Sequence, residues 1–138
     1  MKNLFFFVLV VWAVACTSPD TVLPSQTGRW LFTEHSQTVH TDLLGVKDTA
    51  TNTVSGLMIF RENGSFSRII ASDTSTYSWA YNNTAQHMIV TDNLLSTKIY
   101  KVVLTEGNSE KWKYEQTFEL GINETNVVTE TVELNRQK

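Results

Sequence analysis

Apolar and polar residues alternate most clearly along residues 110–120, which read EKWKYEQTFEL. A period of two with one polar face is typical of a β-strand that has one side on a core. Tyr77, Trp79 and Tyr81 alternate with small or polar residues in the same way. The pattern therefore predicts β-structure, because an α-helix would repeat its apolar positions every 3.6 residues. The apolar face of the first segment comprises Trp112, Tyr114, Gln116, Phe118 and Leu120.

Similar short runs, separated by turn residues, continue along most of the chain, and no helical period competes with them. Every link from the second run onward is short, so neighbouring strands should pair antiparallel. About eight such strands can hide their outer edges by closing on themselves, which predicts an all-β, antiparallel, up-and-down β-barrel. The expected strands cover residues 29–35, 56–62, 66–72, 75–82, 86–92, 96–105, 110–119 and 125–135.

Residues 36–55 are the exception to this pattern. They are rich in Thr, Ser and Asp, and their apolar positions show no regular spacing. We expect a long loop here, with a short helical turn or an extra edge segment inside it. Loops of this length are often functional.

The first sixteen residues, MKNLFFFVLVVWAVAC, form a separate unit. Lys2 is a short positive segment, and residues 4–14 are apolar but too short for a spanning helix, which needs about 20 such residues. Ala13-Val14-Ala15-Cys16 resembles the lipobox of bacterial lipoproteins, in which small residues precede an obligatory cysteine. The alternative is an ordinary signal peptide followed by a chance cysteine.

The lipobox resemblance implies that residues 1–15 are a signal peptide and that Cys16 becomes the acylated N-terminus. Acyl chains on Cys16 would make the membrane a permanent partner, since several chains bind far more tightly than one. Residues 16–27 contain both prolines and little apolar surface, so we interpret them as a lipidated tether. Thr17 in place of Asp is compatible with the outer membrane in bacteria that use that position for sorting, and either face of that membrane stays open.

Gly28-Arg29-Trp30 resembles the G-x-W motif of lipocalins. The resemblance spans residues 28–135 and implies a lipocalin-like barrel, assigned to residues 28–138, that carries a ligand. In lipocalins an arginine of the last strand packs over the motif tryptophan, and Arg136 is a loose match for it. Three further segments follow the motif in order and, after a lipobox, resemble the small lipocalin-like lipoproteins common in Bacteroidetes: Leu57-Met58-Ile59-Phe60, Asn63-Gly64-Ser65-Phe66 and Tyr77-Ser78-Trp79.

Other chemistry is not indicated by the sequence. His35, His40 and His87 lie on different predicted segments, without thiols or carboxylates at metal-site spacing. No nucleophile elbow surrounds a serine, and the six glycines are scattered singly rather than gathered in a phosphate loop. The formal net charge of −3 gives no reason to expect nucleic acid as a partner. We therefore predict a chain without catalytic activity, metal or cofactor.

Aromatic residues crowd the predicted inner face of the barrel. An eight-stranded barrel has an interior that side chains can fill or that holds one small ligand. Each aromatic side chain buries about 150–250 Å², so a filled core and a pocket for a small apolar or amphiphilic ligand are both open readings. The candidate ligand-binding residues are Phe60, Arg68, Tyr77, Trp79, Tyr81, Tyr100, Trp112 and Tyr114.

The hairpin after Phe60 has two allowed registers. A two-residue Asn-Gly loop pairs residues 60 and 67 and turns Arg68 away from Phe60. A three-residue Glu-Asn-Gly loop with a bulge pairs residues 60 and 66 and brings Arg68 to the inner face beside Phe60 and Phe66. An inward Arg68 would need a partner, either Glu130 or an anionic ligand.

These observations support two main hypotheses for function. The first is a membrane-anchored lipoprotein that binds a small apolar or amphiphilic ligand in or at the mouth of the barrel. The second is a non-catalytic structural or protein-interaction module of the cell envelope, which would have a filled core and use its outer face and residues 36–55. An enzyme assembled from residues of different strands is a third hypothesis.

Overall fold

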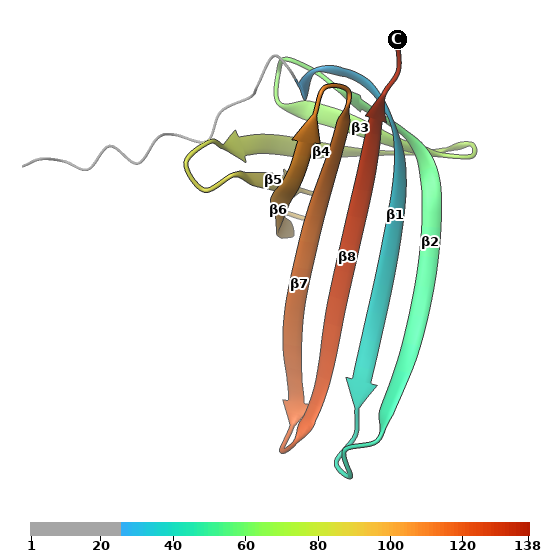
Figure 1. The fold of residues 1–138 in the computed structure, drawn as a ribbon, viewed down its shortest axis with the longest axis vertical. Coiled ribbons are helices and arrows are strands. Elements are labelled where there is room, and N and C mark those ends of the chain that lie inside the picture. The colour runs from blue at the N-terminus through green and yellow to red at the C-terminus, as the bar shows by residue number, and fades with distance from the viewer. Residues whose placement is uncertain (1–25) are drawn as a thin grey trace, which may run out of the picture.

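The computed structural model describes residues 26–138, which form eight antiparallel strands closed into one barrel (Figure 1). The strands follow one another around the barrel in chain order, and β8 closes against β1. The prediction of an all-β, up-and-down, lipocalin-like barrel is therefore confirmed. The strands are β1 Gly28–Thr41, β2 Lys47–Phe60, β3 Ser65–Ile70, β4 Asp73–Asn82, β5 His87–Thr91, β6 Thr97–Glu106, β7 Ser109–Gly121 and β8 Glu124–Arg136.

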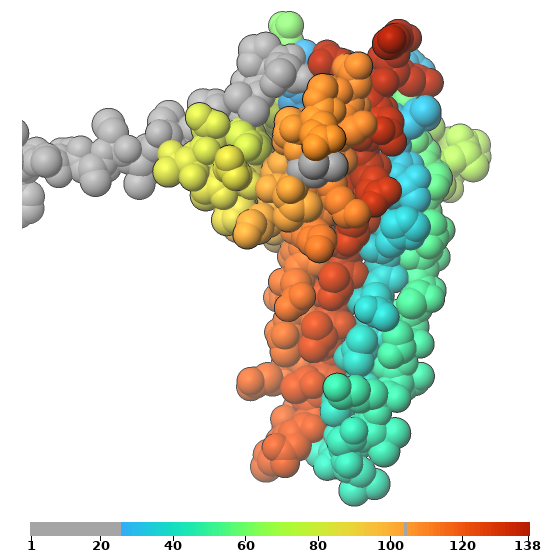
Figure 2. All heavy atoms as spheres, in the orientation of Figure 1, coloured from blue at the N-terminus to red at the C-terminus, as the bar shows by residue number. Residues whose placement is uncertain are grey.

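The strands differ in length, and this difference shapes the molecule. β1, β2, β7 and β8 have 13 or 14 residues each, whereas β3 to β6 have 5 to 10. The long strands are neighbours in the order β7-β8-β1-β2, so their outer halves continue past the short strands as a four-stranded sheet. We call residues 36–55 and 114–130, which form this sheet, the extension. Figure 2 shows the extension standing clear of the barrel body.

Residues 36–55 form the outer half of the β1–β2 hairpin, so the expectation of a long loop there is wrong. The pairing of β1 with β2 runs without interruption to Thr41 and Lys47. Residues 47–53 of β2 are all exposed, because this outer part of the extension lies beyond the barrel core. Without a buried face the hairpin has no apolar alternation, and the β propensity of its threonines is the remaining sequence signal.

A single aspartate organises the turn at the end of this hairpin. Asp42 Oδ1 accepts hydrogen bonds from the backbone N–H groups of Leu44 at 2.8 Å and Val46 at 2.9 Å. Asp92 makes the same two contacts in the β5–β6 turn, to the N–H groups two and four residues further on. Aspartate favours such turns because its short side chain satisfies nearby backbone donors.

Candidate functional site

The end of the barrel where the chain enters is closed by Trp30. Its ring is 1% exposed, and its Nε1 donates a hydrogen bond to the carbonyl oxygen of Gln26 at 2.9 Å. The guanidinium of Arg136 lies over the ring, with Cζ 5.5 Å from the centroid, and donates to the carbonyl oxygen of Thr27 at 2.7 Å. The loose sequence match for the lipocalin arginine thus occupies that position. Gln26 and Thr27, the last two residues of the predicted tether, are held against the barrel.

A partly buried carboxyl group, Glu110, lies beside this closed end. It accepts a hydrogen bond from Trp112 Nε1 at 3.0 Å. The amide nitrogen of Gln26, when oriented toward Glu110, lies 2.8 and 3.0 Å from its two carboxylate oxygens. Burial raises the pKa of Glu110, and the hydrogen bonds from Trp112 and Gln26 and the charge of Arg136 offset this only in part. These contacts join the entering chain to β7.

Phe60 and Trp79 lie in the packed core next to the closed end, not at a cavity. Phe60 stacks on Phe66 with 4.8 Å between ring centroids and meets Trp79 edge-on at 5.4 Å. Trp112 approaches Phe60 at 6.0 Å in the same edge-on manner. Phe60 and Trp79 are no more than 4% exposed. This half of the barrel is therefore filled by aromatic side chains.

The hairpin after Phe60 adopts the bulged register. Phe60 pairs with Phe66, which directs Arg68 to the inner face of β3. Arg68 Nη2 donates to Glu34 Oε2 at 2.9 Å, so its partner is Glu34 and the proposed pairing with Glu130 is wrong. The guanidinium also lies 5.0 Å above the centre of the Phe32 ring, and its buried Nε has no hydrogen-bond acceptor. A carboxylate and an aromatic face together hold the cation.

Glu130 is the partner of Lys98 and Tyr100 instead. Its carboxylate accepts a hydrogen bond from Lys98 Nζ at 2.5 Å and from the Tyr100 hydroxyl at 2.8 Å. Burial, followed by the charge of Glu130, raises the pKa of Tyr100 far above its usual value. The hydroxyl therefore stays protonated and donates to the carboxylate at any physiological pH.

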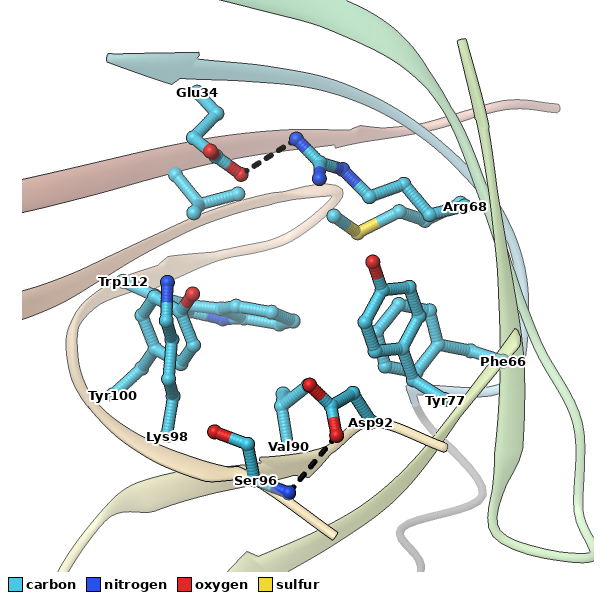
Figure 3. Close-up of a pocket in the computed structure, with 12 residues that line it drawn as sticks. Glu34, Phe66, Arg68, Tyr77, Val90, Asp92, Ser96, Lys98, Tyr100 and Trp112 are labelled. Carbon is cyan, nitrogen blue, oxygen red and sulfur yellow. Dashed lines mark hydrogen bonds and ion pairs between the residues drawn. The ribbon is translucent and has the colours of Figure 1, made fainter. Parts of the chain in front are cut away.

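A cavity of about 180 Å³ lies beyond the aromatic core, on the side where the long strands leave the barrel. Figure 3 shows Tyr77 and Phe66 on one wall, Tyr100 and Trp112 on the opposite wall, and Arg68 across one end. The charged groups Arg68 and Lys98 keep 21% and 42% of their side chains exposed, so they mark its mouth. The lining residues are Glu34, Met58, Phe66, Arg68, Tyr77, Val90, Asp92, Ser96, Lys98, Tyr100, Trp112 and Val132.

Half of the candidate ligand-binding residues line this cavity, namely Arg68, Tyr77, Tyr100 and Trp112. Phe60 and Trp79 belong to the core, as described above. Tyr81 packs against that core, and burial and the charge of Glu110 raise its pKa. Tyr114 lies next to the cavity, where its ring contacts Tyr100 at 5.7 Å and Lys98 Nζ at 5.3 Å.

Several lining residues were not among the candidates. Glu34 lies on the same face of β1 as Trp30 and Phe32, because every second residue of a strand points to the same side. This alternation could have identified Glu34 as an inward residue. Lys98 has the same parity as Tyr100 on β6. Asp92 and Ser96 belong to the β5–β6 turn, and no local pattern indicates that this turn borders a cavity. The remaining unpredicted residues are Met58, Phe66, Val90 and Val132.

Comparisons with models of protein families, with curated proteins and with solved structures give no match. Within residues 26–138, no group of three or more His, Cys, Asp or Glu side chains is placed to hold a metal ion. The same part of the chain contains no helix with the length and apolar character to cross a membrane. The predicted signal peptide, Cys16 and most of the tether lie outside the described residues.

Proposed function

We propose that this protein is a lipid-anchored, non-catalytic binding protein that takes a small amphiphilic ligand in the cavity at the open end of its barrel. The observation that carries the proposal is the division of the cavity into two chemical zones. Its walls are apolar, with Met58, Phe66 and Trp112 among the contributors, whereas its mouth holds paired charges. Pockets of this kind, apolar with a few polar groups, are typical ligand sites.

The volume of the cavity limits the ligand to a small molecule or to one part of a larger one. About 180 Å³ corresponds to roughly six water molecules at the density of the liquid. Sites for drug-sized ligands usually measure about 300–1,000 Å³. A short alkyl chain or a single ring would fill the cavity, and any remainder of the ligand would lie along the concave side of the extension.

The charges at the mouth favour a neutral or cationic head group over a carboxylate. Arg68 is already paired with Glu34, and Lys98 with Glu130. Asp92 adds a third carboxylate against two cations, which leaves one net negative charge. Among residues 26–138, both cations that line the cavity are thus already paired with carboxylates, so an anionic head group would have to compete with these pairs.

Medium-chain probes test the ligand class. We expect purified protein to bind octanol or octylamine in isothermal titration calorimetry and to bind octanoate more weakly. Val90→Phe fills part of the cavity and should weaken binding of the preferred probe by about tenfold, which corresponds to roughly 1.4 kcal/mol. Val103→Phe, at an exposed position on β6, is the matched control and should bind like the parent. Native mass spectra without a bound molecule, together with no binding of any probe, would refute the proposal.

The membrane anchor is tested separately from the cavity. We expect labelled palmitate to be incorporated into the chain expressed in a bacterium and to be lost in Cys16→Ser, because the diacylglyceryl group is attached to the cysteine sulfur through a thioether. The expected location is the cell envelope, most simply the outer membrane. Equal labelling of both chains, or none of the parent, would remove the anchor from the proposal and leave the ligand experiment unaffected.

A further inference from the structure

The extension has two strand edges without a neighbour. β3 pairs only with residues 57–60 of β2, so no strand among residues 26–138 covers the edge of β2 from 47 to 56. β6 pairs with β7 only as far as Lys113. The edge of β7 from 114 to 121 therefore also has no neighbouring strand among residues 26–138. Figure 1 shows β2 and β7 as the borders of the extension. An open edge presents backbone N–H and C=O groups that can pair with another strand.

The two edges differ in the protection that their side chains provide. β7 carries Glu115 and Glu119 along its open part, and in an antiparallel pair of two β7 strands centred on Thr117 these carboxylates would face each other. β2 from 49 to 55 reads TATNTVS, with no charge, no proline and no bulge. Natural sheets usually protect open edges with charged residues, prolines or bulges. The β2 edge has none of these between 49 and 55, so it is the edge available for pairing.

Hydrogen bonds at both ends of β2 show which backbone groups point to its open edge. Asp42 N–H donates to Val46 C=O at 3.0 Å, so Val46 faces β1. Arg61 N–H donates to Ser65 C=O at 2.9 Å, so Arg61 faces the side of β3. These directions alternate along an uninterrupted strand. The backbone N–H and C=O groups of the odd-numbered residues of β2 therefore point away from β1, toward the open edge. On the open part these residues are Thr49, Thr51, Thr53 and Ser55.

We infer that a second copy of this chain pairs with β2 along this edge, antiparallel, around a two-fold axis at Asn52. Thr51 then lies opposite the partner's Thr53, and Thr49 opposite the partner's Ser55, so hydroxyl pairs face each other across the junction. On the concave side, Ala50 meets the partner's Val54. The four facing pairs exchange about eight backbone hydrogen bonds, since each such pair makes two. The inference does not depend on the proposed ligand.

Apolar contacts at the ends of the junction favour this register. Leu44, at the β1–β2 tip, is 88% exposed, and Leu43 and Val46 beside it are 64% and 61% exposed. A surface groove on the outer side of the barrel, where β3 meets β2, is lined mainly by apolar residues, together with Thr33 and Ser55. With the axis at Asn52, the shared ladder ends at Thr49 opposite the partner's Ser55, because Ile69 already pairs with Leu57, so each tip lies beside the partner's groove. Its apolar lining includes Leu31, Leu57, Ile69 and Ala71.

A register with the axis at Thr51 is less complementary. It would place Asp48 opposite the partner's Val54, a charged side chain against an apolar one. A contact between β2 of one copy and β7 of the next would be heterologous and would add further copies without closing. A β2–β2 contact uses the same edge twice and closes as a dimer.

Charge variants test the contact and its register in full-length protein purified in a mild detergent. Sedimentation velocity should give the parent twice the monomer mass. Thr51→Lys/Thr53→Lys places like charges opposite each other and should give the monomer mass. Thr51→Lys/Thr53→Glu places opposite charges there and should restore the dimer. Thr117→Lys, on the β7 edge, is the control and should stay dimeric.

A disulfide provides an independent measurement. Residues that face each other at the axis of such a pair have Cα atoms about 4.5 Å apart, within the range of a disulfide. Cys16 is the one natural cysteine, so Asn52→Cys in a Cys16→Ser background should form a covalent dimer on mild oxidation. Gln37→Cys, exposed one strand further from the edge, should not. A monomeric parent, assemblies larger than a dimer, a Lys/Glu variant that stays monomeric, or no cross-link through residue 52 would each overturn the inference.

Discussion

Replacing Gly56 with alanine is expected to lower the free energy of unfolding by about 3 kcal/mol. A Cβ atom on Gly56 would lie 2.1 Å from the carbonyl oxygen of Ile69 and 2.9 Å from Cε1 of the Phe32 ring. The first contact is with backbone, which cannot rotate away as a side chain could. Ile69 pairs with Leu57, so the carbonyl can move only if the β2–β3 ladder opens at its end. Glycine in a strand often marks such a close backbone approach.

Denaturant unfolding of Gly56→Ala and of a matched glycine variant separates this clash from a general effect of alanine. Gly121→Ala is the control, because its Cβ would have no neighbour closer than 3.8 Å, an ordinary contact distance. We expect the control to change stability by less than about 0.5 kcal/mol. Equal free energies of unfolding for the two variants would contradict this prediction. They would show that the β3 backbone can move at Ile69 without a measurable cost.

The strands that were predicted correctly are those with one face on the barrel core. Tyr77, Trp79 and Tyr81 alternate because the interior takes every second side chain, and this environment repeats along β4. Residues 36–55 belong to an equally regular hairpin but lie outside the barrel, so burial imposes no period on them. Periodicity and burial do not coincide everywhere, however: residues 114–120 of β7 also alternate, yet Phe118 and Leu120 are 41% and 54% exposed, so the expectation that this face lies on a core is wrong beyond Tyr114.

The inward face of each strand was easier to predict than the depth of each side chain along the barrel axis. Trp79 and Tyr77 have the same parity on β4, yet Trp79 lies in the core and Tyr77 lines the cavity. Depth depends on the stagger between strands, which local sequence does not encode. The left-handed φ of 76° at Gly64 belongs to the bulged turn, but glycine there was compatible with both registers.

Charge pairing in the site was the least predictable feature. Arg68 finds Glu34 on β1, and Glu130 on β8 pairs with Lys98 on β6. Each pair joins residues more than 30 positions apart, so the pairing follows from barrel closure and not from any short motif. The need of an inward arginine for a carboxylate could be foreseen from its charge, whereas the choice among carboxylates required the register of four strands.

Trp30→Ala is expected to cost about 3–5 kcal/mol of the free energy of unfolding, the largest loss that we predict for a single substitution. The ring is 1% exposed and lies between the core and the guanidinium of Arg136. Its removal would leave a cavity at the closed end and free the carbonyl oxygen of Gln26 from its hydrogen bond. A buried acceptor that loses its donor adds to the cost of the lost packing.

Trp30→Phe is the matched variant, because it keeps an aromatic ring under Arg136 while losing the indole N–H. Its cost should fall well below that of Trp30→Ala, to about 1–2 kcal/mol, and chemical denaturation followed by far-ultraviolet circular dichroism measures both. Similar losses for the two variants would mean that the hydrogen bond to Gln26, not ring packing, carries the stability of this end. If neither variant lost more than about 1 kcal/mol, the G-x-W tryptophan would not be what closes the barrel, and Gln26 and Arg136 would have to hold that end without it.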